Sequence, residues 1–143
     1  MTKETERQGG ARPAEPSVTS SAVGRPRVVP KPWGEERIFA EGTRYAGKIL
    51  VIRSGQTLSY QYHERKEETL HVLDGELCLE TEEAGRRFTL RLSPGETFHV
   101  TPGTRHRMFA EAGDCTVVEV STPELDDVIR LEDRYGRQGT TKP

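Results

Sequence analysis

Residues 55–75 read GQTLSYQYHERKEETLHVLDG, and the first half of this stretch alternates strictly between apolar and polar side chains. The alternation runs through Leu58, Ser59, Tyr60, Gln61, Tyr62 and His63. A repeat of two is typical of a β-strand, because successive side chains point to opposite faces of a sheet. The stretch ends at Asp74-Gly75, a pair that is typical of a two-residue hairpin turn. It therefore predicts one strand before the charged segment and a hairpin after it.

Strand-like runs recur along the rest of the chain and are separated by turns that contain Gly or Pro. Besides residues 57–63 and 69–73, these runs cover residues 37–41, 45–53, 76–80, 87–92, 97–100, 107–111 and 116–121. Eight or nine short strands at this spacing predict an antiparallel sandwich or barrel. Residues 123–135 are the only helical candidate, and one short helix or turn is expected there.

The chain of 143 residues is predicted to hold one folded domain with a tail at each end. Residues 1–28 are rich in Gly, Pro, Ser, Thr and charged side chains and show no apolar periodicity, so they are expected to be a disordered tail. Residues 138–143 look the same and are expected to be a disordered C-terminus. The folded domain then covers residues 29–137, which is long enough for one core.

Composition excludes several classes of protein. The formal net charge is -2, so nothing attracts the chain in bulk to nucleic acid or to an anionic membrane. The longest apolar run covers residues 49–52, too short to span a bilayer, and residues 1–10 lack the apolar core of a signal peptide. Two cysteines, Cys78 and Cys115, make neither a disulfide framework nor a CxxC zinc motif. A cytoplasmic protein with a small-molecule substrate is expected.

Two segments framed by glycine carry the candidate ligands. The first, residues 55–75, contains His63 and Glu68, and the second, residues 95–106, ends in His106. Together they resemble the two motifs of the cupin family, which implies an all-β, single-domain fold, a short jelly-roll β-barrel with one divalent metal ion inside. Carried over by position, His63, Glu68 and His106 are the implied ligands. Imidazole and carboxylate ligands with open coordination positions suit iron, manganese, zinc or nickel.

One position departs from the pattern of that family. The resemblance places a second histidine two residues after His63, where this chain has Arg65. Gln61 lies on the same predicted face as His63 and is a candidate for the missing ligand. Arg65 is a candidate for binding an anionic substrate, because a guanidinium pairs well with carboxylate and phosphate groups. His71 and His99 are out of phase with the inward-facing positions of their strands and are expected to be structural.

A narrower resemblance rests on three segments, which are Lys31-Pro32-Trp33-Gly34, Gln61-Tyr62-His63, and residues 126–137, DDVIRLEDRYGR. They are similar to the type II mannose-6-phosphate isomerase cupin, a domain that also ends many mannose-1-phosphate guanylyltransferases. The resemblance implies a metal-dependent enzyme, mannose-6-phosphate isomerase-like, that acts on a small anionic sugar-type substrate. Two alternatives stay open. One is an iron-dependent dioxygenase, lyase or decarboxylase, and the other is a non-catalytic ligand-binding or dimerisation cupin.

Three further expectations concern the surface. Leu58, Tyr60 and Tyr62 form an apolar stripe opposite the candidate ligands, which predicts a homodimer with sheet-to-sheet contact. The charged residues 64–67 are expected to form a solvent-exposed turn between two strands. Cys78, on the charged face of its strand, is expected to be a surface thiol.

Overall fold

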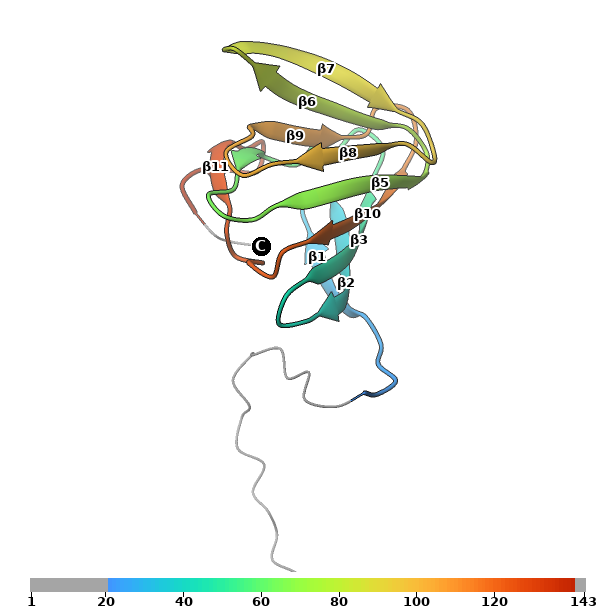
Figure 1. The fold of residues 1–143 in the computed structure, drawn as a ribbon. Coiled ribbons are helices and arrows are strands. Elements are labelled where there is room, and N and C mark those ends of the chain that lie inside the picture. The colour runs from blue at the N-terminus through green and yellow to red at the C-terminus, as the bar shows by residue number, and fades with distance from the viewer. Residues whose placement is uncertain (1–20, 141–143) are drawn as a thin grey trace, which may run out of the picture.

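The computed structural model describes residues 21–140 of the chain, so residues 1–20 and 141–143 lie outside the described part. This part contains eleven strands and no helix (Figure 1). The strands are β1 (Arg27–Lys31), β2 (Gly34–Glu41), β3 (Ala46–Ile52), β4 (Tyr60–Tyr62), β5 (Glu68–Asp74), β6 (Leu77–Glu83), β7 (Arg86–Leu92), β8 (Thr97–Val100), β9 (His106–Phe109), β10 (Cys115–Ser121) and β11 (Ile129–Glu132). The predicted all-β class is confirmed.

The strands form two antiparallel sheets that face each other (Figure 1). One sheet has six strands in the order β1-β2-β3-β10-β5-β8, and the other has five in the order β11-β4-β9-β6-β7. Strands distant in sequence are neighbours in space, as where β10 pairs with both β3 and β5. Apolar residues from both sheets meet between them and form the core, among them Trp33, Leu50, Leu70, Leu79, Met108 and Val117. The architecture is the predicted jelly-roll type of sandwich.

The inner face of the six-stranded sheet changes character along its strands. At one end it is apolar, through Ile52 and Leu50 of β3, Cys115 and Val117 of β10, and Val72 and Leu70 of β5. At the other end the same inward alternation continues through charged residues, which are Lys48, Glu119 and Glu68. All three charged residues are at most 7% exposed. The alternation that builds the core therefore also carries charged groups into the interior.

Two segments differ from the prediction at the ends of the domain. β1 begins at Arg27, inside the predicted 1–28 tail, and residues 1–20 of that tail lie outside the described residues. Of the short helix or turn expected over residues 123–135, turns are present and a helix is not, and the segment also contains the strand β11. The inward residue of β11 is Arg130, so the apolar alternation that signals a strand is missing there. Within residues 21–140 no helix is long and apolar enough to cross a membrane.

The apolar stripe that predicted a homodimer is covered within the chain itself. Leu58 belongs to the core, and Tyr60 is 1% exposed. The guanidinium carbons of Arg87 and Arg107 lie 3.8 and 5.6 Å from the centre of the Tyr60 ring, so these cations cover it. Tyr62 is half-buried. The homodimer stays a prediction, but this stripe does not support it.

Cys78 is fully buried, so the expectation of a surface thiol is wrong. The charged face of β6 is covered here by the neighbouring strand, because Cys78 pairs in register with Arg91 of β7. The Nη1 atom of Arg91 lies 3.5 Å from the Cys78 sulfur and also binds Glu76. Burial raises the pKa of this thiol, which keeps it in the unreactive protonated form.

The hairpin predicted at Asp74-Gly75 is wrong, because β5 pairs with β10 and β8 in one sheet and β6 pairs with β7 and β9 in the other. The turn instead carries the chain from one sheet to the other, and its glycine provides a test of the fold. Gly75 has a φ of +76°, and a Cβ atom there would lie 2.2 Å from the carbonyl oxygen of Asp114. Gly85, in the β6–β7 turn, has the same φ of +76° but open space around it. Gly85→Ala should therefore cost only the strain of a positive φ, about 1–2 kcal/mol. Gly75→Ala should lower the free energy of unfolding by more than this, because the Asp114 backbone must also move. Urea unfolding measures both, and equal losses would contradict the close approach.

Candidate metal centre

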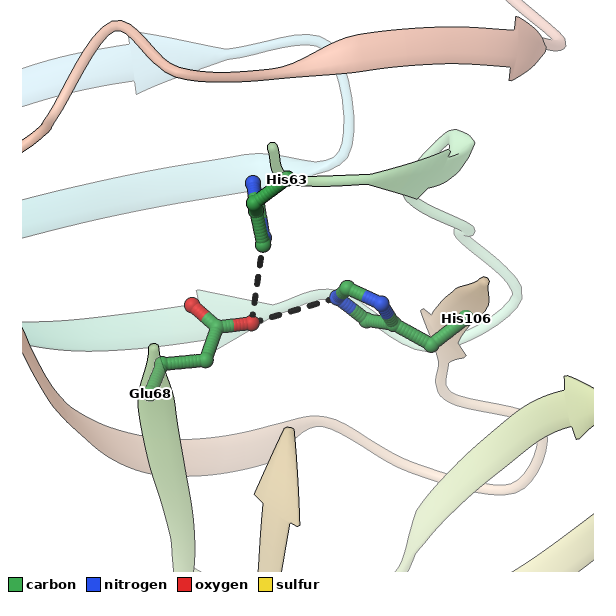
Figure 2. A group of neighbouring side chains, drawn as sticks. All are labelled: His63, Glu68 and His106. Carbon is green, nitrogen blue, oxygen red and sulfur yellow. Dashed lines mark hydrogen bonds and ion pairs between the residues drawn. The ribbon is translucent and has the colours of Figure 1, made fainter. Parts of the chain in front are cut away.

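Three buried side chains from different parts of the fold meet in the interior (Figure 2). His63 directly follows β4, Glu68 is the first residue of β5, and His106 is the first residue of β9. Their candidate ligand atoms all lie within 4.8 Å of one another, and each residue is at most 2% exposed. The structure thus brings together the three residues that the sequence marked as ligands.

The orientation of both imidazoles is fixed by backbone carbonyl groups. His63 Nδ1 binds the carbonyl oxygen of Asp127, and His106 Nδ1 binds that of Thr104 at 2.9 Å. A carbonyl oxygen only accepts, so Nδ1 must be the donor in both rings. In the neutral ring the proton is then on Nδ1, and Nε2 presents a lone pair.

Both Nε2 atoms face the same oxygen of Glu68. The distances from Oε1 are 3.3 Å to His63 Nε2 and 3.1 Å to His106 Nε2 (Figure 2). The contact with His106 lacks hydrogen-bond geometry, so its buried Nε2 has no hydrogen-bond partner among the described residues. Two lone pairs aimed at a carboxylate repel unless a positive species, a proton or a metal cation, lies between them. The donor set therefore fits a divalent cation, with both rings held as ligating histidines usually are.

The second oxygen of Glu68 is held by a buried lysine. Lys66 Nζ lies 3.0 Å from Glu68 Oε2 and 3.1 Å from Glu119 Oε2, and the residue is 3% exposed. Burial alone would lower the pKa of Lys66, but the two carboxylates outweigh it and raise that pKa. The expected solvent-exposed turn at residues 64–67 is therefore wrong for Lys66. This side chain turns inward because two buried carboxylates need a cation.

The charge on Glu68 follows from these contacts. Burial alone would raise the pKa of Glu68, but its neighbours, above all the Lys66 ammonium group, hold it well below its usual range. Glu119 differs, because burial and the nearby charge of Glu68 raise its pKa above the ordinary value. Of the two carboxyl groups, the one beside the imidazoles therefore ionises more readily, which suits a metal ligand.

Asp127 connects the C-terminal segment to the site. Its carboxylate accepts the backbone N–H groups of Glu64, Arg65 and Lys66 at 3.1, 2.7 and 2.8 Å. Burial alone would raise the pKa of Asp127, but these three donors outweigh it and lower that pKa. The same residue supplies the carbonyl oxygen that orients His63. Sequence reasoning missed this role, and the only signal was the Asp126-Asp127 pair in the terminal segment.

Gln61 and Arg65 occupy different places. Gln61 lies directly opposite His106 in the β4–β9 pair, lines the interior cavity, and accepts a hydrogen bond from Ser59 Oγ at 2.6 Å. Arg65 is exposed in the turn after His63, at the edge of the same cavity. Inward alternation thus brings Gln61, two residues before His63, to the wall beside the three candidate ligands.

The two other histidines do not belong to this group. His71 is half-buried in β5, and His99 is exposed in β8, where it pairs with Glu67 at 2.6 Å.

The cavity beside the candidate ligands has a volume of about 680 Å³, which is in the usual range for small-molecule sites. His63, Gln61, Lys66 and Glu119 all line it.

A family model of the cupin domain matches residues 48–121, and the chain belongs to this family. The match spans the strands from β3 to β10 and so includes all three candidate ligands.

Two relatives and one solved structure show how far the similarity extends along the chain. The chain is 31% identical over 120 residues to mannose-1-phosphate guanylyltransferase ManC of Salmonella typhimurium, which covers 78% of this chain and 23% of the relative. It is 35% identical over 118 residues to D-lyxose/D-mannose isomerase of Serratia proteamaculans, covering 62% of this chain and 49% of the relative. The chain thus spans about a quarter of the first relative and half of the second. Among solved structures, KdgF from Halomonas sp. has a TM-score of 0.59 at 25% identity, over 67% of this chain and 85% of KdgF.

The buried lysine gives a stability test of the site. Lys66→Met removes the cation between Glu68 and Glu119 and should lower the free energy of unfolding at pH 7 by about 3–5 kcal/mol, since two buried carboxylates lose their partner. Arg65→Met is the matched control, because it removes the same charge from the exposed neighbouring residue. Urea unfolding without added metal compares the two. Similar small losses in both variants would contradict the role of Lys66.

Proposed function

We propose that this protein is a metal-dependent cupin enzyme, mannose-6-phosphate isomerase-like, that acts on a small anionic sugar-type substrate. The observation that carries the proposal is the convergence of two Nε2 atoms on one carboxylate oxygen, at 3.3 and 3.1 Å. His63, Glu68 and His106 would hold one divalent ion, either iron, manganese, zinc or nickel. Two imidazoles and one carboxylate leave positions open for substrate and water. When bound, such an ion polarises a carbonyl oxygen of the substrate.

The residues of the chain have separate tasks in this proposal. The carbonyl groups of Asp127 and Thr104 hold the two rings so that Nε2 faces inward. Lys66 engages Glu68 Oε2 and leaves Oε1 directed at the imidazoles. Gln61, on the cavity wall opposite His106, is the candidate for a fourth ligand or for a contact with a substrate hydroxyl group. Arg65, at the edge of the cavity, is a candidate for attracting an anionic substrate.

The isomerase type of reaction is supported by the relative that is named a D-lyxose/D-mannose isomerase. An isomerisation needs a carbonyl group to be polarised and a proton to be moved between neighbouring carbons, and a polar cavity of about 680 Å³ can enclose a small sugar. The cytoplasmic location and the homodimer remain predictions beside this proposal.

Metal binding is the first test. Protein stripped with a chelator should take up about one manganese, iron, zinc or nickel ion per chain. His63→Ala and His106→Ala should each lose more affinity than the 10–100-fold that is typical of a change behind the ligands. His99→Ala is the matched control and should bind as the original protein does, because His99 is exposed and does not belong to the three residues whose ligand atoms converge. Metal content by mass spectrometry and titration calorimetry measure these effects.

Activity and oxygen dependence separate the alternatives. The metal-loaded protein should interconvert mannose 6-phosphate and fructose 6-phosphate without consuming oxygen. Turnover that requires oxygen would favour a dioxygenase instead. Failure of the original protein to bind any of the four metals would favour a binding or dimerisation domain.

The fourth ligand position can be tested with two substitutions to histidine. Gln61→His places an imidazole on the cavity wall opposite His106 and should tighten metal binding. Arg65→His places one in the exposed turn and should leave metal affinity nearly unchanged. Titration calorimetry with the same metal compares both variants. Tighter binding by Arg65→His alone would assign the position to residue 65.

A further inference from the structure

A second group of largely buried charges lines the same cavity, on β1, β2 and β3 at one side of the six-stranded sheet and on β11 at the edge of the other sheet. It consists of Lys31 of β1, Glu36 of β2, Lys48 of β3 and Arg130 of β11. The side chains of Lys31, Glu36 and Lys48 are 11%, 14% and 9% exposed, and Arg130 is 9% exposed. The local sequence pattern predicts a role for none of these four side chains, although Lys31 and Arg130 lie in segments that carry the narrower resemblance.

Charges of opposite sign alternate from the metal centre to this group. The series runs through Glu68, Lys66, Glu119, Lys48, Glu36 and Lys31. Lys48 lies opposite Glu119 in the β3–β10 register, and its Nζ is 3.3 Å from Glu36, which is also 3.7 Å from Lys31. The alternation then stops, because the next charged neighbour of Lys31 is another cation, Arg130.

Arg130 has no carboxylate partner within ion-pair distance among residues 21–140. Its Nη1 donates to the carbonyl oxygen of Thr140 at 2.7 Å, while its buried Nε has no hydrogen-bond partner in this part of the chain. The nearby Arg137 differs, because Asp133 binds it in a bidentate pair at 2.8 and 3.0 Å. Arg130 is therefore a buried guanidinium that lines the cavity with unused donor capacity.

Lys31, Lys48 and Arg130 lie near Glu36, while Glu119 also attracts Lys48 and Asp133 also attracts Arg130. Asp133 is already paired with Arg137, so positive charge is in excess here, which is unfavourable in a buried position. Burial and the neighbouring cations Lys48, Arg130 and Arg137 lower the pKa of Lys31 despite its contact with Glu36. Burial and the charge of Arg137 likewise lower the pKa of Arg130. A multiply charged anion in the cavity would offset this cost, and phosphate accepts hydrogen bonds from both ammonium and guanidinium groups.

The position of Arg130 relative to the metal centre suggests how a substrate would lie. Arg130 is opposite Gln61 in the β11–β4 pair, and Gln61 is opposite His106 in the β4–β9 pair. The three residues form a row across the sheet, and neighbouring strands are about 4.8 Å apart. Arg130 and His106 are thus separated by about 10 Å at the backbone, with Gln61 between them. This separation leaves room for a short carbon chain or a sugar ring.

We propose that Lys31, Lys48 and Arg130 form an anion subsite that binds the phosphate group of a sugar phosphate while its carbonyl end reaches the metal centre. The part of this inference that brings the carbonyl end of the sugar to the metal centre rests on the proposed function. The inference assigns selection of the phosphate to the buried group on β1, β3 and β11, whereas Arg65 attracts the anion at the edge of the cavity.

The first experiment uses metal-free, full-length protein and titration calorimetry with inorganic phosphate, mannose 6-phosphate and mannose. Both phosphate compounds should bind and mannose should not. Lys31→Met and Arg130→Met should each weaken phosphate binding by at least tenfold. Arg44→Met removes the same charge from an exposed loop and should bind phosphate as the original protein does. Unchanged phosphate binding in both Lys31→Met and Arg130→Met would overturn the subsite.

Stability provides a second readout that does not depend on activity. Because Lys31 adds to an excess of buried cations and Glu36 keeps its contact with Lys48, Lys31→Met should fold and should unfold at the same or a higher urea concentration than the original protein. Added phosphate should raise the thermal midpoint of the original protein and leave that of Lys31→Met unchanged. A destabilised Lys31→Met whose midpoint still rises with phosphate would show that Lys31 is only structural.

Addition of metal separates failure of the subsite from failure of the proposed function. If the sugar reaches the metal, manganese should tighten the binding of mannose 6-phosphate more than that of inorganic phosphate. Equal effects on both would mean that the group binds free phosphate only, which contradicts the substrate arrangement. Metal binding without phosphate binding would overturn the subsite alone, and phosphate binding without metal binding would overturn the proposed function alone.

Discussion

The ammonium group of Lys66 lies between the carboxylates of Glu68 and Glu119, and the interior of this domain depends on that arrangement. Without a cation at this position, two buried carboxylates would repel each other and would tend to take up protons. With it, Glu68 stays ionised and presents one oxygen to two imidazoles. The Asp127 carboxylate accepts a hydrogen bond from the backbone N–H of Lys66. Lys66 therefore connects β5 and β10, which carry its two carboxylate partners, to the segment before β11.

The two ends of the inner face of the six-stranded sheet differ in character, since one end is packed and apolar and the other lines a polar cavity. The apolar end, with Leu50, Leu70 and Val117, supplies the packed core. The charged end, with Lys48 and Glu119, gives a polar cavity that apolar side chains could not provide. Because strands run through both regions, the rigid core positions the charged groups directly. A site built on strands in this way holds its geometry better than one built on loops.

Sequence alone could predict the parts of this structure that follow local rules. The alternation at residues 57–63, the turns that contain Gly and the motif histidines led to the all-β class and to the three candidate ligands. The hairpin predicted at Asp74-Gly75 was wrong, because which strands pair across a turn depends on the strand order of the whole sandwich. The prediction of strands failed where an inward position is polar, as at Arg130, since the apolar alternation that marks a strand is then absent. Sequence reasoning also failed for Lys66, which resembles a solvated residue in a charged run until the partner Glu119, fifty-three positions later, is brought beside it. Such partners are set by strand order, which the local pattern does not contain.

The contact between His63 and the Asp127 carbonyl group has a consequence for the order of events during folding. His63 and Glu68 are only five residues apart, but the ring of His63 has no fixed tautomer until the segment that carries Asp127 docks against the turn after β4. A growing chain that has released its first ten strands therefore contains every candidate ligand and still lacks an oriented site. Under the proposed function, a correctly oriented metal site would therefore form only after the segment with Asp127 has docked.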